Sequence, residues 1–155
     1  MNNIKVAFYK GEGLRRDKFI RWWTNSPYSH VELVMPSGII AGIRPPDDPV
    51  IRRRCFKEMI EEEWELVNIE VNPKQLNLIR DFIDNTSGHG YDWVGMIASH
   101  LMPLKVSIPN RWYCSEWVAY ALAVSRVIPK KQSLLYKSAR ISPGKLYRII
   151  KNLRV

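Results

Sequence analysis

The strongest constraint on the fold of this chain is a change in the spacing of its apolar residues near position 72. Before it, short apolar runs are separated by Gly, Pro and Ser, which is typical of strands. After it, apolar residues recur every three or four positions, as on one side of a helix. Asn72 and Pro73 mark the change, because Asn is a favourable N-cap and Pro suits the first helical position. Strands in the first half and helices in the second predict an α+β fold, with a small antiparallel sheet packed against helices.

The first half contains several segments with strand character. The tripeptide Pro36-Ser37-Gly38 separates two of them and predicts a tight hairpin. An irregular loop is expected at 44–49 and a short polar helix or turn at 57–63. The predicted strands cover residues 5–9, 29–35, 38–43, 50–56 and 64–71.

One predicted helix interrupts the strands of the first half. From Leu14 to Trp23, aromatic and basic residues mix at helical spacing, which predicts a basic amphipathic helix ending near Thr24. We expect its aromatic side to pack on the core rather than on a membrane. In the second half, helices are predicted from Pro73 to the glycine at 88, over 91–102, over 114–124 and over 144–152.

Length and charge limit the class of protein. The 155 residues predict a single domain covering 1–155, and the net charge is +9. Basic residues gather at 10–21, 52–57 and 137–155, which leaves two alternatives open: a solvated basic surface, or a surface for an anionic lipid or wall polymer. The sequence has no recognisable nucleic-acid module. It has neither a signal peptide nor an apolar run of roughly 20 residues, so a cytoplasmic location is expected.

The two cysteines form no disulfide framework and have different surroundings. Cys114 lies where an aromatic loop, with Trp112 and Tyr113, meets the start of an apolar helix. Free backbone amides and the positive end of the helix dipole favour a thiolate there, and the amides can also bind an oxyanion. Cys114 is therefore a candidate nucleophile, with a buried core thiol as the alternative. Cys55 lies in an alternating strand and is interpreted as structural.

A thiolate nucleophile needs a base, and the candidates are the three histidines. His30 and Glu32 share one face of an apolar strand, where an unpaired polar residue would be costly to bury. His89 is flanked by two glycines and is interpreted as a surface loop residue, and His100 lies near a helix end. His30 is therefore the preferred base. No paired Cys or His spacing indicates a metal site, and no cofactor is expected.

Three segments together carry a resemblance to a known family: residues 27–34 (Pro-Tyr-Ser-His-Val-Glu-Leu-Val), 91–95 (Tyr-Asp-Trp-Val-Gly) and 112–116 (Trp-Tyr-Cys-Ser-Glu). In this order they resemble the circularly permuted NlpC-like hydrolases of papain-like fold, the group that includes the lecithin retinol acyltransferase-like enzymes. The chain looks especially similar to small phage-encoded members. The resemblance spans about residues 4–125.

The resemblance implies a site and a chemistry. It implies that Cys114 is the nucleophile of a cysteine peptidase-like hydrolase or acyltransferase and that His30 is its general base. Such families place a third polar residue on the strand after the histidine strand, but Ala41 stands near the expected position. Glu32 is the nearest substitute, although alternate side chains along a strand lie roughly 7 Å apart. Tyr28, Trp112 and Tyr113 are candidate substrate-binding residues, with core packing as the alternative.

Two classes of function follow. The first is a thiol-dependent hydrolase or acyltransferase that acts on an amide or ester bond, with a peptide or a lipid ester as substrate. A phage-encoded cell-wall peptidase, located in the host cytoplasm or the phage particle, is one enzyme of this kind. The second is a weakly active or inactive member of the fold that acts as a binding module for a host protein, a membrane surface or a virion. Nucleic-acid binding through the basic patches is a third hypothesis, which predicts a steep dependence on salt.

Overall fold

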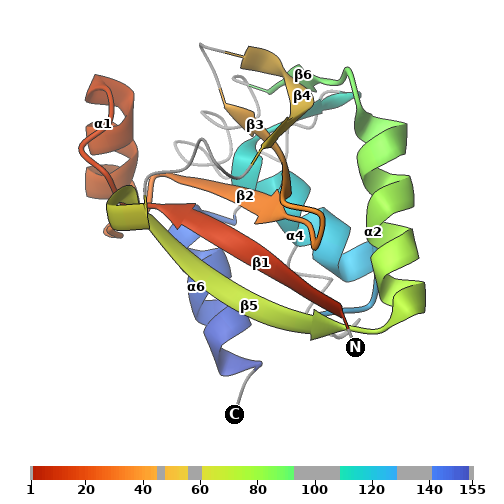
Figure 1. Cartoon of the computed structure of the whole chain (residues 1–155). Helices are drawn as coiled ribbons and strands as arrows, with labels where there is room; N and C mark the ends of the chain where they lie inside the picture. The colour runs from red at the N-terminus through yellow and green to blue at the C-terminus, as the bar shows by residue number, and fades with distance from the viewer. Residues whose placement is uncertain (1, 45–47, 56–60, 93–108, 129–140, 154–155) are drawn as a thin grey trace.

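A computed structural model describes residues 2–44, 48–55, 61–92, 109–128 and 141–153, with backbone only for 48–55. The predicted α+β class is confirmed, because a mainly antiparallel sheet packs against helices (Figure 1). Among these residues, no helix is long and apolar enough to cross a membrane.

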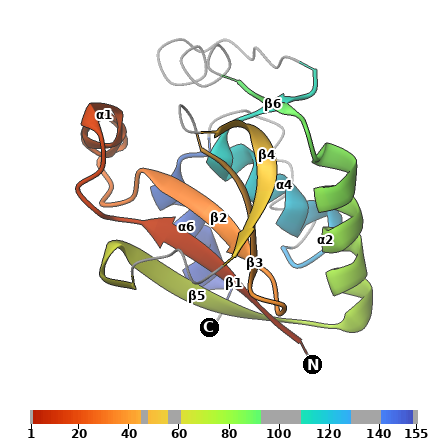
Figure 2. The same cartoon turned by 45° about the horizontal axis from the view of Figure 1, so that its top comes forward.

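The sheet brings strands from both halves of the chain together in the order β5-β1-β2-β3-β4-β6-β7. Neighbouring strands are antiparallel except for the short pair β6 and β7, which is parallel. Figure 2 shows β4 curving over the sheet toward β6, which lies next to the start of α4. The strands are β1 (Asn2–Tyr9), β2 (His30–Val34), β3 (Ile39–Arg44), β4 (Asp48–Cys55), β5 (Trp64–Val71), β6 (Gly90–Tyr91) and β7 (Arg111–Trp112).

The hairpin between β2 and β3 forms where the sequence predicts it. The Met35 amide donates to the Ile39 carbonyl across the turn, and Gly38 has a φ of 79°, a conformation that glycine adopts without steric cost. This short connection fixes the register, so that Leu33 pairs with Ala41 and Val34 with Ile40. The side chains that β2 directs to each face of the sheet follow from this register.

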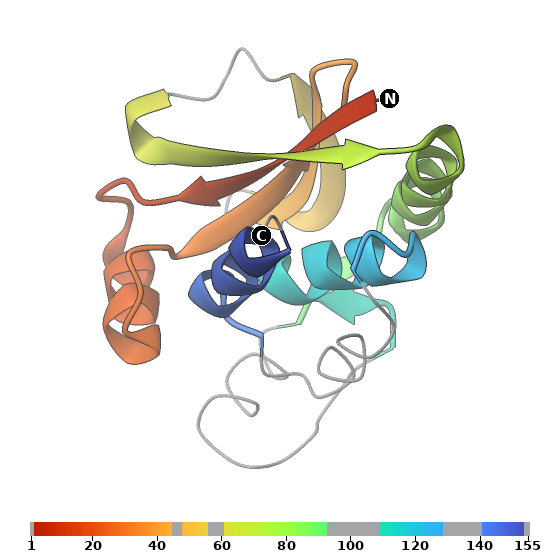
Figure 3. The ribbon, with the colours of Figure 1, turned by 90° about the horizontal axis from the view of Figure 1, so that it is seen from below.

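Three helices cover one face of the sheet: α2 (Pro73–Thr86), α4 (Cys114–Val124) and α6 (Pro143–Asn152). Trp117 of α4 is fully buried between sheet and helices, and its indole donates a 2.9 Å hydrogen bond to Thr86 of α2. Asn72 caps α2 through a capping box with Gln75, as the sequence predicts for this start. Figure 3 shows α4 and α6 under the sheet, with α2 beside one end of it.

The helix α1 (Arg15–Thr24) lies at the opposite end of the sheet, between the end of β1 and the start of β2 (Figures 1 and 3). Asp17 is its one buried residue among those described. The Asp17 carboxylate accepts hydrogen bonds from the Leu14 amide and the Ser29 hydroxyl, and so ties α1 to the residue before His30. The expectation that the aromatic side of this helix packs on the core is wrong, because Trp22 is 75% exposed and Phe19 is 55% exposed.

The prediction of a helix over 91–102 is wrong at its first residue, Tyr91. Tyr91 belongs to β6, where it pairs with Trp112 of β7, and the Asp92 amide donates to the Trp112 carbonyl. The short polar element predicted at 57–63 is a 3-10 helix over Glu61–Glu63 in its described part. Residues 93–102 lie outside the described residues.

Candidate active site

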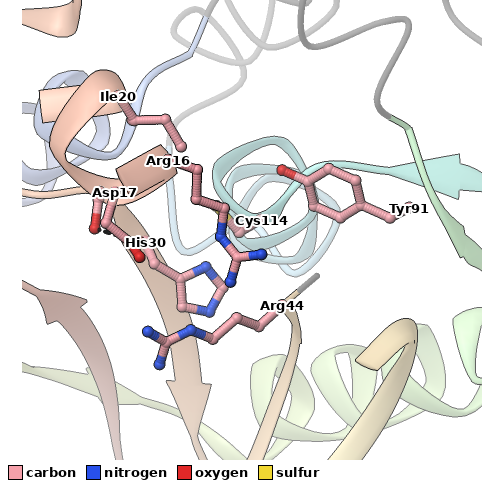
Figure 4. Close-up of a pocket in the computed structure, with 8 residues that line it drawn as sticks. Arg16, Asp17, Ile20, His30, Arg44, Tyr91 and Cys114 are labelled. Atoms are coloured by element: carbon pink, nitrogen blue, oxygen red, sulfur yellow. Dashed lines mark hydrogen bonds between the residues drawn. The ribbon is translucent and has the colours of Figure 1, made fainter. Parts of the chain in front are cut away.

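The structure brings Cys114 and His30 together. Cys114 is the first residue of α4, His30 is the first residue of β2, and these two elements pack against each other. Both side chains are buried and line the same small pocket, which has a cavity volume of about 20 Å³ (Figure 4). The pocket lining consists of Arg16, Asp17, Ile20, Ser29, His30, Arg44, Tyr91 and Cys114.

Glu32 contacts His30 directly. The His30 Nε2 atom lies 3.1 Å from Glu32 Oε1, and both side chains are almost fully buried. The side-chain rotamers of His30 and Glu32 bring the imidazole and the carboxylate much closer together than the roughly 7 Å that separates alternate side chains along a strand. Because Nε2 is engaged by the carboxylate, Nδ1 is the ring nitrogen that remains for Cys114.

The small residues on either side of Glu32 make room for its carboxylate. Ala7 pairs with Glu32 from β1. On the other side, a Cβ built on Gly42 would lie only 2.7 Å from Glu32 Cγ, so any larger residue there would displace the glutamate. Ala41, where the family resemblance places a third polar residue, is fully buried in the core with the helices. A side chain at 41 therefore occupies the other face of the sheet from Glu32.

The electrostatics of the site favour a protonated His30. Burial lowers the pKa of His30, but the charge and hydrogen bond of Cys114, together with the Glu32 carboxylate, raise it to about 9. Two acidic partners on the two sides of one imidazole favour the imidazolium form. At neutral pH this arrangement corresponds to an imidazolium between the sulfur of Cys114 and the Glu32 carboxylate.

The start of α4 supplies a favourable environment for negative charge at Cys114. Tyr113 is the N-cap and its side chain makes no capping hydrogen bond, and Glu116 accepts a hydrogen bond from the Tyr113 amide. Burial, and then the charge of Asp92, raise the pKa of Glu116 to about 7 although this backbone hydrogen bond opposes the shift. A partly protonated Glu116 places less negative charge two residues from the thiol than a fully ionised one.

Two arginines, which sequence reasoning missed, belong to the pocket. Arg16 reaches in from α1, and Arg44 comes from the end of β3 (Figure 4). The guanidinium carbon of Arg44 lies 4.4 Å from the centroid of the Tyr9 ring, a cation–π contact that holds this side chain in place. Arginines in a predicted amphipathic helix and at a strand end carry no signal that distinguishes them from surface residues.

Tyr91 also lines the pocket, although the sequence predicted it only as the start of a helix. Burial raises the pKa of the Tyr91 hydroxyl, and the negative charge of Cys114 raises it further. Tyr91 therefore keeps its proton at neutral pH and faces the thiol as a neutral polar group. The strand pairing of β6 with β7, which the sequence did not predict, positions it there.

The three predicted substrate-binding residues do not line this pocket. Tyr28 packs against Phe8 and Tyr147, and its hydroxyl donates to Glu65. Trp112 packs against Phe82 and Tyr120 and donates a 3.0 Å hydrogen bond to His89 Nδ1. Tyr113 is buried in the core cluster beside Cys114. Core packing, the alternative for these aromatic residues, is the role that these contacts indicate.

The remaining residues considered in the sequence have simpler placements. His89 is half-buried and bonded to Trp112, so it is not the exposed loop residue that the sequence suggested. The side chain of Cys55 and all of His100 lie outside the described residues. Within the described part of the chain, no group of three His, Cys, Asp or Glu side chains has the arrangement of a metal site.

Comparison with protein-family models, with curated proteins and with solved structures finds no match for this chain. The class of protein therefore depends on the site alone: a buried Cys-His-Glu arrangement at a helix start, in an α+β fold.

Proposed function

We propose that this protein is a thiol-dependent hydrolase or acyltransferase that acts on an amide or ester bond. The observation that carries the proposal is the arrangement of Cys114, His30 and Glu32, in which one imidazole is shared by a thiol and a carboxylate. A nucleophile, a base within hydrogen-bond reach and a group that orients the base are the components of covalent acyl transfer.

The chemistry follows from these groups. The Cys114 thiolate attacks the substrate carbonyl carbon, a C–S bond forms, and the oxygen gains the negative charge. Backbone amides at the start of α4 are suited to bind this oxyanion. The His30 imidazolium then donates its proton to the leaving nitrogen or oxygen as the C–N or C–O bond breaks. Neutral His30 next accepts a proton from water or another acceptor, which attacks the thioester and releases the acyl group.

Glu32 acts on this reaction through His30. Its carboxylate bonds Nε2, which directs Nδ1 toward the thiol and stabilises the imidazolium that exists before leaving-group protonation. The support for a working site is the burial of this carboxylate in a position that only small neighbours permit, since an unpaired buried charge would cost several kcal/mol.

The proposal is tested with an activated ester and with thiol alkylation. Incubation with p-nitrophenyl acetate is expected to release a burst of p-nitrophenol and to leave an acetyl group on Cys114, located by peptide mass spectrometry. We expect no burst from Cys114→Ser. His30→Asn is expected to slow both the burst and alkylation by iodoacetamide at pH 7 by at least about 100-fold.

His89→Asn is the matched control, since it removes the other described histidine and leaves the pocket intact. An alkylation rate equal to that of free cysteine, unchanged in His30→Asn, would contradict the proposal. That result would favour the second class of function, a binding module with this fold.

A further inference from the structure

We infer that the pocket beside Cys114 binds an anionic group of the substrate, a carboxylate or a phosphate, through Arg16 with Arg44. This inference depends on the proposed function and specifies the substrate class for the same site. Its evidence is separate from the catalytic residues: two guanidinium groups that line the pocket and contain buried nitrogens without a hydrogen-bond partner.

The unmet hydrogen-bonding capacity is specific. Among the described residues, Arg16 Nη2 and Arg44 Nε are two of three buried side-chain polar atoms that have no partner. A buried donor without an acceptor is unfavourable, and more so where the group is charged. Two such donors at one small pocket indicate a site that an acceptor from outside the chain completes.

Two acidic side chains near the pocket, Asp17 and Glu32, already have partners. Asp17, which lines the pocket, accepts from the Leu14 amide and from the Ser29 hydroxyl. Glu32 holds His30 through Oε1. These hydrogen bonds of Asp17 and Glu32 do not involve Arg16. The positive charge of Arg16 lowers the pKa of Tyr91, which also lines the pocket. The pocket therefore presents cationic donors next to the nucleophile, a combination that recognises carboxylate and phosphate.

The position of Arg16 gives the anion a defined place in the substrate. In Figure 4 its side chain extends from α1 into the space bounded by His30, Cys114 and Tyr91. An anion bound there lies close to the carbonyl that the thiolate attacks. We therefore expect a substrate whose negative group is separated from the scissile bond by only a few atoms.

A second role for Arg16, support of the thiolate by its charge alone, makes a different prediction. Such support changes the reaction of Cys114 with every electrophile equally, whereas an anion site changes the reaction with anionic electrophiles only. Iodoacetate and iodoacetamide separate the two roles, because they deliver nearly the same group to the thiol and differ in one negative charge.

We expect Arg16→Gln to lower the rate of iodoacetate alkylation at Cys114 by about tenfold relative to the rate with iodoacetamide. Arg80→Gln is the matched control, since it removes one exposed positive charge on α2, away from the pocket, and should leave the ratio unchanged. Acetate, inorganic phosphate and methyl phosphate, each tested as a protectant against iodoacetamide, distinguish a carboxylate from a phosphate site.

An unchanged ratio in Arg16→Gln, or equal loss with both reagents, would overturn the anion site. The iodoacetamide rate and its dependence on His30 test the proposed function separately, so the two failures are distinguishable. Arg44→Gln should also lower the ratio of the iodoacetate rate to the iodoacetamide rate. Circular dichroism of each variant shows whether it is folded.

A second inference follows from independent observations on the opposite side of α1. We propose that the outer side of this helix binds a membrane that contains anionic phospholipids. Its exposed apolar side chains are Leu14 at 53%, Phe19 at 55%, Trp22 at 75% and Trp23 at 39%, and its basic residues are Arg15, Lys18 and Arg21. We call these seven residues the α1 surface.

The rings of the α1 surface pack on one another instead of on the core. The ring centroid of Phe19 lies 6.0 Å from that of Trp22 and 5.7 Å from that of Trp23. Exposed tryptophan and phenylalanine on a short helix with flanking cations are the composition of interfacial membrane-binding helices. Charge complementarity identifies the partner, because the one acidic residue within α1, Asp17, is buried.

The same helix contributes Arg16, Asp17 and Ile20 to the pocket on its inner side. Membrane binding through the α1 surface would therefore hold the Cys114 site near the lipid headgroups. This placement does not require the enzyme to be active, so membrane binding can be tested without any substrate.

Cosedimentation with vesicles tests the second inference. We expect binding to vesicles of phosphatidylglycerol and phosphatidylcholine at low salt, and much weaker binding to phosphatidylcholine alone. The double variant Phe19→Ala with Trp22→Ala should lose at least about tenfold in affinity, since it removes two large exposed apolar groups. Both residues are on the surface, so the fold should be retained, and circular dichroism checks this.

The matched charge control compares two double variants. Arg15→Gln with Lys18→Gln on α1 should weaken binding by about 30-fold, at roughly 1 kcal/mol for each of the two cations near the surface. Lys74→Gln with Arg80→Gln on α2 removes the same charge from exposed positions and should have little effect. Equal loss from both pairs, or binding that does not require phosphatidylglycerol, would overturn the proposal.

Discussion

The His30 Nε2 atom lies 3.1 Å from Glu32 Oε1, so the base and its carboxylate come from the same strand, two residues apart. Both side chains are buried, and the start of α4 places Cys114 on the other side of the imidazole. One strand therefore fixes the orientation of the base without a contribution from its neighbour. The neighbour, β3, contributes space instead, through Gly42.

The first prediction concerns Glu32. Replacing Glu32 with Gln keeps the size of the side chain and removes its charge, so the pKa of His30 should fall from about 9 toward its ordinary value. The rate of Cys114 alkylation by iodoacetamide at pH 7 should fall by about 10- to 100-fold, less than for loss of the base itself. Alkylation rates across pH 5–10 and the NMR titration of the His30 ring check both effects.

Glu70→Gln is the matched control for Glu32→Gln, because Glu70 is an exposed residue on β5 of the same sheet. The Glu70→Gln substitution should leave the pKa of His30 unchanged. A His30 pKa in Glu32→Gln equal to that of the unaltered protein would show that the carboxylate has no effect on the base.

The second prediction concerns the other partner of His30. The charge and hydrogen bond of Cys114 raise the pKa of His30, so Cys114→Ser, which keeps the size but carries no charge at these pH values, should lower it. Because burial also lowers this pKa, the midpoint should fall by at least about one unit. In the unaltered protein the His30 ring should remain protonated at pH 7.5 and lose its proton near pH 9. The NMR chemical shifts of the ring, recorded from pH 5 to 10, measure both midpoints.

Much of the fold could be predicted from the sequence, because local rules decided it. The Pro-Ser-Gly turn, the Asn72 cap and the apolar periodicity of α4 each specify an element through its own residues. Tyr91 shows the limit of such rules. Its strand forms by pairing with β4 on one side and with Trp112 of β7, 21 positions away, on the other, and no property of residues near Tyr91 encodes these partners.

The residues of the candidate site also divide into those that local sequence rules predict and those that they do not. Cys114 and His30 could be identified from their positions at a helix start and on an apolar strand, and Glu32 from its shared face with His30. Arg16 and Arg44 could not be identified, because their role depends on where α1 lies against the sheet. The exposed side of α1 was missed because an amphipathic pattern specifies two faces but not which face meets the core.

The third prediction concerns Glu116, whose pKa is raised to about 7, chiefly by burial. A raised pKa means that the folded state binds more protons than the unfolded state between about pH 4.5 and 7, so this group lowers stability as the pH rises through that window. Glu116→Gln cannot ionise and can still accept from the Tyr113 amide. It should raise the free energy of unfolding at pH 8 by on the order of 1 kcal/mol and change it little at pH 4.5.

Urea unfolding at pH 4.5 and pH 8 measures this difference. Asp81→Asn, at an exposed position on α2, should give the same small change at both pH values. Equal stability of Glu116→Gln and the unaltered protein at pH 8 would show that burial of Glu116 carries no penalty for its charge.

The fourth prediction concerns the space that Gly42 leaves for Glu32. A Cβ at position 42 would lie 2.7 Å from Glu32 Cγ, closer than atoms of neighbouring side chains pack, and 3.2 Å from Glu32 Cβ, which is a tight contact. Gly42→Ala should therefore displace the Glu32 carboxylate from His30 and cost about 1–3 kcal/mol of stability through overpacking. Its effect on the pKa of His30 should match that of Glu32→Gln, although the carboxylate is still present.

Gly90→Ala is the matched control for Gly42→Ala, because its new Cβ would lie 3.7 Å from the nearest atom, an ordinary contact. NMR titration of the His30 ring and urea unfolding of both variants measure the two effects, and an unshifted His30 midpoint in a folded Gly42→Ala would show that the glutamate keeps its place without the glycine.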